Sequence, residues 1–148
     1  MDKEGNGRGE FVPEITALTC IYCGYMSADT AGTLRFTYPS NVKLVRLPCT
    51  GKVDVCHLLN AFEEGADGVY VVACAIGNCH HVHGNDRAVK RVEYTKKLLD
   101  EVGIGGERLD MVFTTGGMGA TFANAAKRMT ERVKKLGPNP LKKTVKEE

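Results

Sequence analysis

Residues 68–85 read G-V-Y-V-V-A-C-A-I-G-N-C-H-H-V-H-G-N, and this stretch indicates both a fold and a candidate site. Residues 69–73 are β-branched, aromatic and small, which is typical of a strand buried on both faces. The strand is expected to end at Cys74, and a glycine-containing turn follows it. That turn leads to four possible metal ligands: Cys79, His80, His81 and His83. Metal-binding side chains are therefore concentrated where a central strand gives way to a loop.

The same alternation of strand and helix extends over the whole chain. Strands are expected over residues 14–20, 42–47, 69–73 and 109–113, and helices over 24–34, 54–64, 87–102 and 122–136. Because no hairpin signal joins these strands, the pattern predicts a parallel sheet covered by helices. The expected fold class is a small doubly wound, flavodoxin-like α/β domain with a four-stranded parallel sheet and helices on both faces. We expect this single domain over residues 13–138, with flexible tails over 1–12 and 139–148.

Length and composition exclude several classes of function. The chain has 148 residues, 43% hydrophobic and 26% charged, and a net charge of +2, which suits one soluble domain. This charge is too small to indicate nucleic-acid binding, and no basic patch is interleaved with aromatic residues. No apolar run approaches the roughly 20 residues of a membrane-spanning helix, so no membrane insertion is expected. The first ten residues contain no apolar signal core, and we expect a cytoplasmic protein.

Five of the six cysteines are expected at one edge of the predicted sheet. Three of them end successive strands, and two follow in the loops beyond: Cys20, Cys49 and Cys74, then Cys23 and Cys79. Ligands of open α/β sheets collect at the carboxyl ends of the strands. Since neighbouring strands lie roughly 4.8 Å apart, three such ends fall within about 10 Å. We therefore predict a metal site built from these five cysteines.

Cys56 and His57 are expected to be separate from that site. Cys56 lies beside apolar positions of the predicted helix that Asp54 caps, so we expect a small buried hydrophobic residue. His57, on the same helix, is expected at the surface.

Three alternatives remain for the five edge cysteines. They could be unreactive core residues, although their placement at one edge makes this unfavourable. They could bind metal as thiolates, either zinc in an interaction module or an iron–sulfur cluster, and spacing alone does not separate the two. Finally, C-I-Y-C at Cys20 and Cys23 resembles the motif of a thiol–disulfide oxidoreductase, although that activity would not require the other three cysteines.

Several segments together resemble the delta (iron–sulfur) subunit of methyl-viologen-reducing hydrogenases. They are I-T-A-L-T-C-I-Y-C-G-Y, A-D-T-A-G, Y-P-S-N-V-K-L-V-R-L-P-C-T-G-K-V-D, A-F-E-E-G-A-D-G-V-Y-V-V-A-C, G-N-C-H-H-V-H-G-N and R-V-x-x-x-K-x-L-L. The resemblance runs from about residue 15 to about residue 140, and the motifs match in order and spacing. The family pattern has cysteines at Cys20, Cys23, Cys49, Cys74 and Cys79, but not at Cys56.

The resemblance implies a [2Fe–2S] protein that relays single electrons and has no catalytic site of its own. Its partners would be a hydrogenase or formate dehydrogenase and the flavoprotein subunit of a heterodisulfide-reductase-type complex, where electron bifurcation occurs. Five cysteines are one more than such a cluster needs. The resemblance does not identify the extra one.

The remaining signals are interpreted structurally. The three histidines are expected to line the loop or a partner interface rather than to bind metal. Gly116, Gly117 and Gly119 match no nucleotide-binding motif and suit a tight turn between strand and helix. The basic residues over 87–97 indicate a solvated helix face or, alternatively, a surface for an acidic partner.

Overall fold

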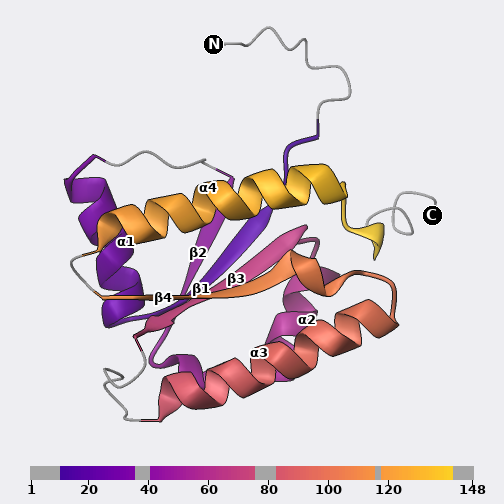
Figure 1. The fold of residues 1–148 in the computed structure, drawn as a ribbon, viewed down its shortest axis with the longest axis horizontal. Coiled ribbons are helices and arrows are strands. Elements are labelled where there is room, and N and C mark those ends of the chain that lie inside the picture. Colours follow the sequence, from indigo (N-terminus) through magenta and orange to yellow (C-terminus); the bar gives the residue numbers. More distant parts are fainter. Residues whose placement is uncertain (1–10, 36–40, 76–82, 116–117, 142–148) are drawn as a thin grey trace, which may run out of the picture.

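A computed structural model gives the fold of residues 11–35, 41–75, 83–115 and 118–141 (Figure 1). The strands are β1 (Ile15–Cys20), β2 (Val42–Leu47), β3 (Gly68–Cys74) and β4 (Leu109–Thr114). The α-helices are α1 (Cys23–Thr33), α2 (Val55–Glu63), α3 (Gly84–Glu101) and α4 (Gly119–Leu136). Two short 3-10 helices, η1 (Thr50–Lys52) and η2 (Gly106–Arg108), precede α2 and β4.

The strands of the described part form one parallel sheet in the order β2-β1-β3-β4. This order matches the first four strands of the 2-1-3-4-5 order of flavodoxin-like folds. The predicted fold class is therefore confirmed. Every residue of β3 is buried, as its continuous apolar run predicts, because β3 has a strand on each side and helices above and below.

Helices cover both faces of the sheet (Figure 1). On one face, α1 and α4 pack against each other and enclose a cluster that includes Ile15, Tyr70 and Phe122. On the other face, α2 and α3 enclose a second cluster that includes Leu58, Val71 and Leu99. None of the described helices is both long enough and apolar enough to cross a bilayer.

Two helices begin earlier than their apolar periodicity indicates. α3 starts at Gly84 and α4 at Gly119, each three residues before the expected start. At Gly119 a Cβ atom would lie 2.7 Å from the backbone nitrogen of Ala31, so glycine lets the start of α4 approach α1 closely. Glycine carries no apolar side chain, which is why the periodicity missed this turn. Gly116 and Gly117 lie outside the described residues.

The packed region extends beyond residue 138, where a flexible tail was expected to begin. Asn139 is 0% exposed, and its side chain donates to the carbonyl groups of Phe62 (2.9 Å) and Ala66 (2.8 Å). Its backbone N–H donates to the Asp67 carboxylate at 2.8 Å. The buried guanidinium of Arg108 bonds the neighbouring carbonyl groups of Gly137 and Pro138. Asn139 lies between two prolines, and such a sequence is typical of a loop. Its side-chain amide is nevertheless buried in the core.

Candidate metal centre

The carboxyl edge of the sheet carries the candidate metal centre. Cys20 is the last residue of β1 and Cys74 the last of β3, which is the neighbouring strand. Cys49 follows β2, on the other side of β1, and Cys23 is the first residue of α1. Because all the strands are parallel, these four residues lie at the same edge. Cys79 lies outside the described residues.

Cys20 and Cys74 form a close thiol pair at this edge. Their sulfur atoms are 3.7 Å apart, and the residues are 2% and 3% exposed. Two thiolates bound to one tetrahedral metal at about 2.3 Å would have sulfur atoms about 3.8 Å apart. The observed spacing therefore suits two ligands of one metal ion.

Backbone N–H groups of two glycines point at the thiols. The N–H of Gly24 donates to Cys20 Sγ at 3.1 Å, and the N–H of Gly51 donates to Cys49 Sγ at 3.3 Å. A Cβ atom on Gly24 would lie 2.6 Å from the carbonyl oxygen of Val72 in β3. Glycine therefore lets the first turn of α1 lie against the sheet with its N–H aimed at sulfur. Such donors stabilise a thiolate more than a neutral thiol.

Burial raises the pKa of the Cys20 thiol to about 11. The neighbouring Cys74 raises this pKa further, whereas the hydrogen bond from Gly24 acts in the opposite direction. Cys20 therefore holds its proton at neutral pH, and a metal ion that bound its sulfur would have to displace that proton. A low-pKa attacking thiol, as in thioredoxin-like motifs, has the opposite property.

The structure brings together only part of the predicted ligand set. Within the described residues, no group of three or more cysteine, histidine or acidic side chains is close enough to hold one metal ion. Cys23 is half-buried, and Cys49 is buried beside η1. His83 is exposed, and its Nδ1 lies 3.4 Å from the Asp86 carboxylate. His80 and His81, like Cys79, are outside the described residues.

The expectation of a buried Cys56 is wrong, because this residue is exposed. The buried side of α2 carries Leu58 and Phe62, and Cys56 lies off that stripe in the first turn. His57 is exposed as predicted, and its Nδ1 accepts from the backbone N–H of Asp54 in a capping box.

The surface around the cysteine edge is partly apolar and partly basic. Large apolar side chains are exposed near the carboxyl ends of β1 and β4 and at the first turns of α1 and α4: Ile21, Met26, Phe113 and Met118. Beside Cys49, a shallow cavity of about 310 Å³ is lined by Lys52, His83 and Arg87 among others. The buried thiols thus lie beside a surface whose composition suits contact with another protein.

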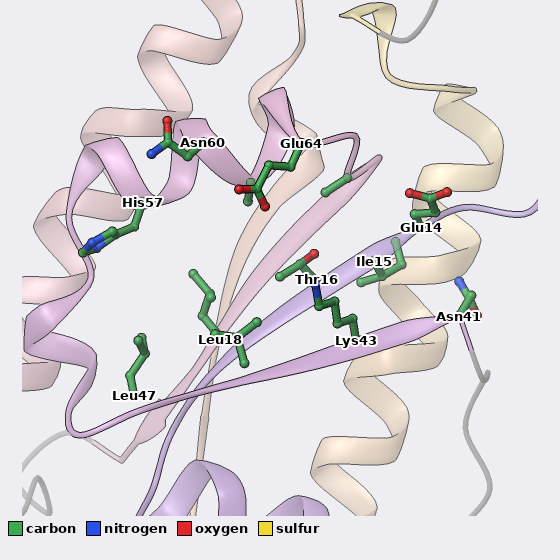
Figure 2. A pocket seen from close by; sticks show the side chains of 13 residues that line it. Glu14, Ile15, Thr16, Leu18, Asn41, Lys43, Leu47, His57, Asn60 and Glu64 are labelled. Atoms are coloured by element: carbon green, nitrogen blue, oxygen red, sulfur yellow. The ribbon is translucent and has the colours of Figure 1, made fainter.

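A larger groove, of about 500 Å³, lies elsewhere between α2 and the strands β1 and β2 (Figure 2). Leu47 lies at one end of it, and Glu14 and Asn41 lie at the other (Figure 2). Its lining contains no cysteine, so the groove adds no ligand to the thiol pair.

The family model of the methyl-viologen-reducing hydrogenase delta subunit matches residues 15–137. The chain belongs to this family. The match runs from the start of β1 to the end of α4. It therefore includes the whole described sheet and the four edge cysteines that the structure describes. The family match therefore covers the same residues as the α/β fold.

The chain is similar to two kinds of curated protein. It is 52% identical over 130 residues to the vhu iron-sulfur subunit of the F420-non-reducing hydrogenase of Methanocaldococcus jannaschii, covering 88% of this chain and 97% of that protein. Identity to the protein of the same name from Methanococcus maripaludis is 50%, with the same coverage. It is also 32% identical over 136 residues to one subunit of the Ferredoxin/F(420)H(2)-dependent CoB-CoM heterodisulfide reductase of Methanosarcina acetivorans, covering 92% of this chain but 17% of that protein.

Two polar residues of α3 contact the backbone near the edge cysteines, and the sequence did not predict these contacts. Asn85 donates a hydrogen bond to the end of β3, and Arg91 donates one to the segment that follows Cys49. In the sequence both belong to a polar, basic segment and carry no motif of their own. Their role depends on contacts with segments 10 to 40 residues away.

Proposed function

We propose that this chain is a [2Fe–2S] electron-transfer subunit. It relays electrons between a hydrogenase or formate dehydrogenase and the flavoprotein subunit of an electron-bifurcating, heterodisulfide-reductase-type complex. The ligands come from Cys20, Cys23, Cys49, Cys74 and Cys79. The observation that carries the proposal is the buried pair of Cys20 and Cys74 sulfur atoms at 3.7 Å, on adjacent strand ends.

The close thiol pair and the N–H groups that donate to Cys20 and Cys49 support such a cluster. Cys20 and Cys74 would bind one iron, and the second iron would take its ligands from Cys23, Cys49 and Cys79. N–H donors from Gly24 and Gly51 already point at two of the thiols, and hydrogen bonds to sulfur are one means by which a protein sets a cluster's potential. The bound cluster supplies one-electron chemistry, while the chain excludes water from Cys20 and Cys74 and fixes their separation.

A thiol–disulfide oxidoreductase is less well supported. Cys20 has a close sulfur partner in Cys74, on another strand, which the C-x-x-C motif does not include. The raised pKa of Cys20 also disfavours a reactive thiolate. Zinc would accept the same thiol geometry, and the names of the related hydrogenase subunits favour iron.

The partners are proposed from the two kinds of relative. The full-length matches are named as hydrogenase subunits, which supports a hydrogenase on one side. A similar segment makes up 17% of one heterodisulfide reductase polypeptide, which supports association with a subunit of that kind on the other side. The exposed apolar side chains near the thiols provide a surface on which either partner could approach the cluster.

Metal and sulfide analysis of the anaerobically purified full chain tests the cluster. We expect about two iron and two acid-labile sulfide per chain, and an EPR signal on reduction. One equivalent of zinc, with no sulfide, would exclude the cluster. Cys56→Ser is the matched control, because Cys56 is exposed on α2 and should leave the iron content unchanged. Anaerobic co-purification with both partner classes tests the relay, and a chain that binds neither would contradict it.

A further inference from the structure

The first half of α3 contacts two of the segments that carry edge cysteines. Asn85, in the first turn, is 0% exposed, and its Nδ2 donates to the carbonyl oxygens of Cys74 (2.9 Å) and Ala75 (3.0 Å). These carbonyl groups mark the place where β3 ends and its chain leaves the sheet. Asn85 thus fixes the backbone of Cys74 and of the next residue.

Arg91 makes the corresponding contact with the segment after Cys49. Its Nη1 donates to the carbonyl oxygens of Gly51 (2.6 Å) and Val53 (2.8 Å), which lie in and directly after η1. The two backbones also touch, because a Cβ atom on Gly51 would lie 2.9 Å from the Cα of Gly84. The cysteine segment therefore rests directly on the start of α3 and is held there by a charged donor.

Because α3 is an 18-residue helix, it can set the separation of the two bonded segments. Positions 85 and 91 are separated by about 9 Å along a helix axis, at about 1.5 Å per residue. Asn85 holds the Cys74 end, and Arg91 holds the Cys49 end. Neither contact uses the sulfur atoms, so both act through the backbone.

We propose that Asn85 and Arg91 are positioning residues that hold Cys49 and Cys74 at the separation the metal centre requires. This inference rests on the proposed function, since it assigns a purpose to the spacing of two of the proposed ligands. It predicts separable effects: losing the Arg91 contact loosens the Cys49 segment, and losing the Asn85 contact loosens the end of β3. A general destabilisation of α3 would instead affect both segments together.

Hydrogen exchange, measured by mass spectrometry on the full chain, tests the two contacts. Arg91→Met should accelerate exchange of the amides of Lys52 and Val53, which bond Cys49 O and Thr50 O, by about tenfold or more, and leave the end of β3 unchanged. Arg91→Lys, which keeps a charged donor, should restore at least half of the protection. Asn85→Asp removes both donors at constant size and should accelerate exchange at the end of β3 instead. Lys97→Met, on an exposed position of the same helix, is the control and should change neither segment.

The same variants are then examined for the cluster itself. Arg91→Met is expected to alter the EPR line shape of the reduced chain and the midpoint potential of its cluster. Arg91→Lys is expected to return both properties toward the wild type. Exchange that stays within about twofold of wild type in both segments, or rises uniformly across the chain, would overturn the inference. An unaltered EPR signal and potential in Arg91→Met would also overturn it. A wild-type chain without iron and sulfide would refute the proposed function alone, because the exchange measurement still decides whether the two contacts act separately.

Discussion

Replacing Gly24 by alanine is expected to displace the first turn of α1 from the sheet and to weaken the metal centre. The new Cβ would lie 2.6 Å from the carbonyl oxygen of Val72, a backbone atom of the central strand, and 3.4 Å from Cys20 Sγ. Neither the strand nor the helix start can rotate away, so the turn must shift by about 0.5 Å or more to restore an ordinary contact. That shift would also move the N–H of Gly24 that donates to Cys20.

The size of the effect follows from two opposing terms. Overpacking of this kind costs about 1–3 kcal/mol of unfolding free energy. Alanine in place of glycine recovers up to about 1 kcal/mol in a helix. Gly32, on the same helix, is exposed and has no atom within 4 Å of its would-be Cβ. Gly32→Ala should therefore gain the helix propensity of alanine without the cost of overpacking. The two variants should therefore differ in unfolding free energy by about 1–3 kcal/mol.

Urea unfolding of both variants, with the iron content of the anaerobically purified chains, measures this difference. We expect Gly24→Ala to unfold at lower urea and to retain less iron than wild type, and Gly32→Ala to match or exceed wild type in both. If the two variants had equal urea midpoints and Gly24→Ala kept its full iron content, the metal centre would not require the close approach of α1 to β3.

Three further predictions concern single residues. Cys74→Ser should lose most of the iron, whereas Cys56→Ser should keep it, as measured by iron and sulfide analysis; equal retention would remove Cys74 from the site. The metal-free chain should lose stability as the pH rises from about 9 toward about 11, because burial raises the pKa of Cys20 from 9.0 to about 11 and the folded state there holds a proton that the unfolded state has released. Urea midpoints at several pH values would show this, and Cys20→Ala should flatten this part of the profile; an unchanged slope would contradict the cause. Asn139→Ala should lower the unfolding free energy by about 2–4 kcal/mol, because two buried carbonyl groups lose their donor; a chain shortened after residue 138 should behave alike, and a loss below about 0.5 kcal/mol would show that the segment is dispensable.

The fold could be predicted from the sequence because its main signals are local. The continuous apolar run of β3 predicts a strand that is buried on both faces, and Asp54 predicts the start of α2 through its cap. The edge location of Cys20 and Cys74 followed from the strand ends together with the rule that parallel strands end on the same side. Their separation of 3.7 Å did not follow, since it depends on strand register and side-chain rotamer.

Features that depend on distant contacts could not be predicted in this way. Cys56 is next to apolar positions in the sequence, but the rotation of α2 on the sheet exposes it. Asn139 has the composition of a tail, and only the carbonyl groups of Phe62 and Ala66 explain its burial. The two bonds of Arg91 likewise join residues 38 and 40 positions apart, so an isolated basic helix gives no sign of them.

One carboxylate, that of Asp67, accepts the N–H of Glu14 at 2.8 Å and the N–H of Asn139 at 2.8 Å. Glu14 lies just before the first strand and Asn139 just after the last helix, so the two ends of the folded domain meet beside the start of β3. The thiols lie at the other end of the same strands. A linker or second domain joined to the described segment at residue 11 or residue 141 would thus start on the side remote from the sulfur atoms, and would leave the cysteine edge sterically accessible.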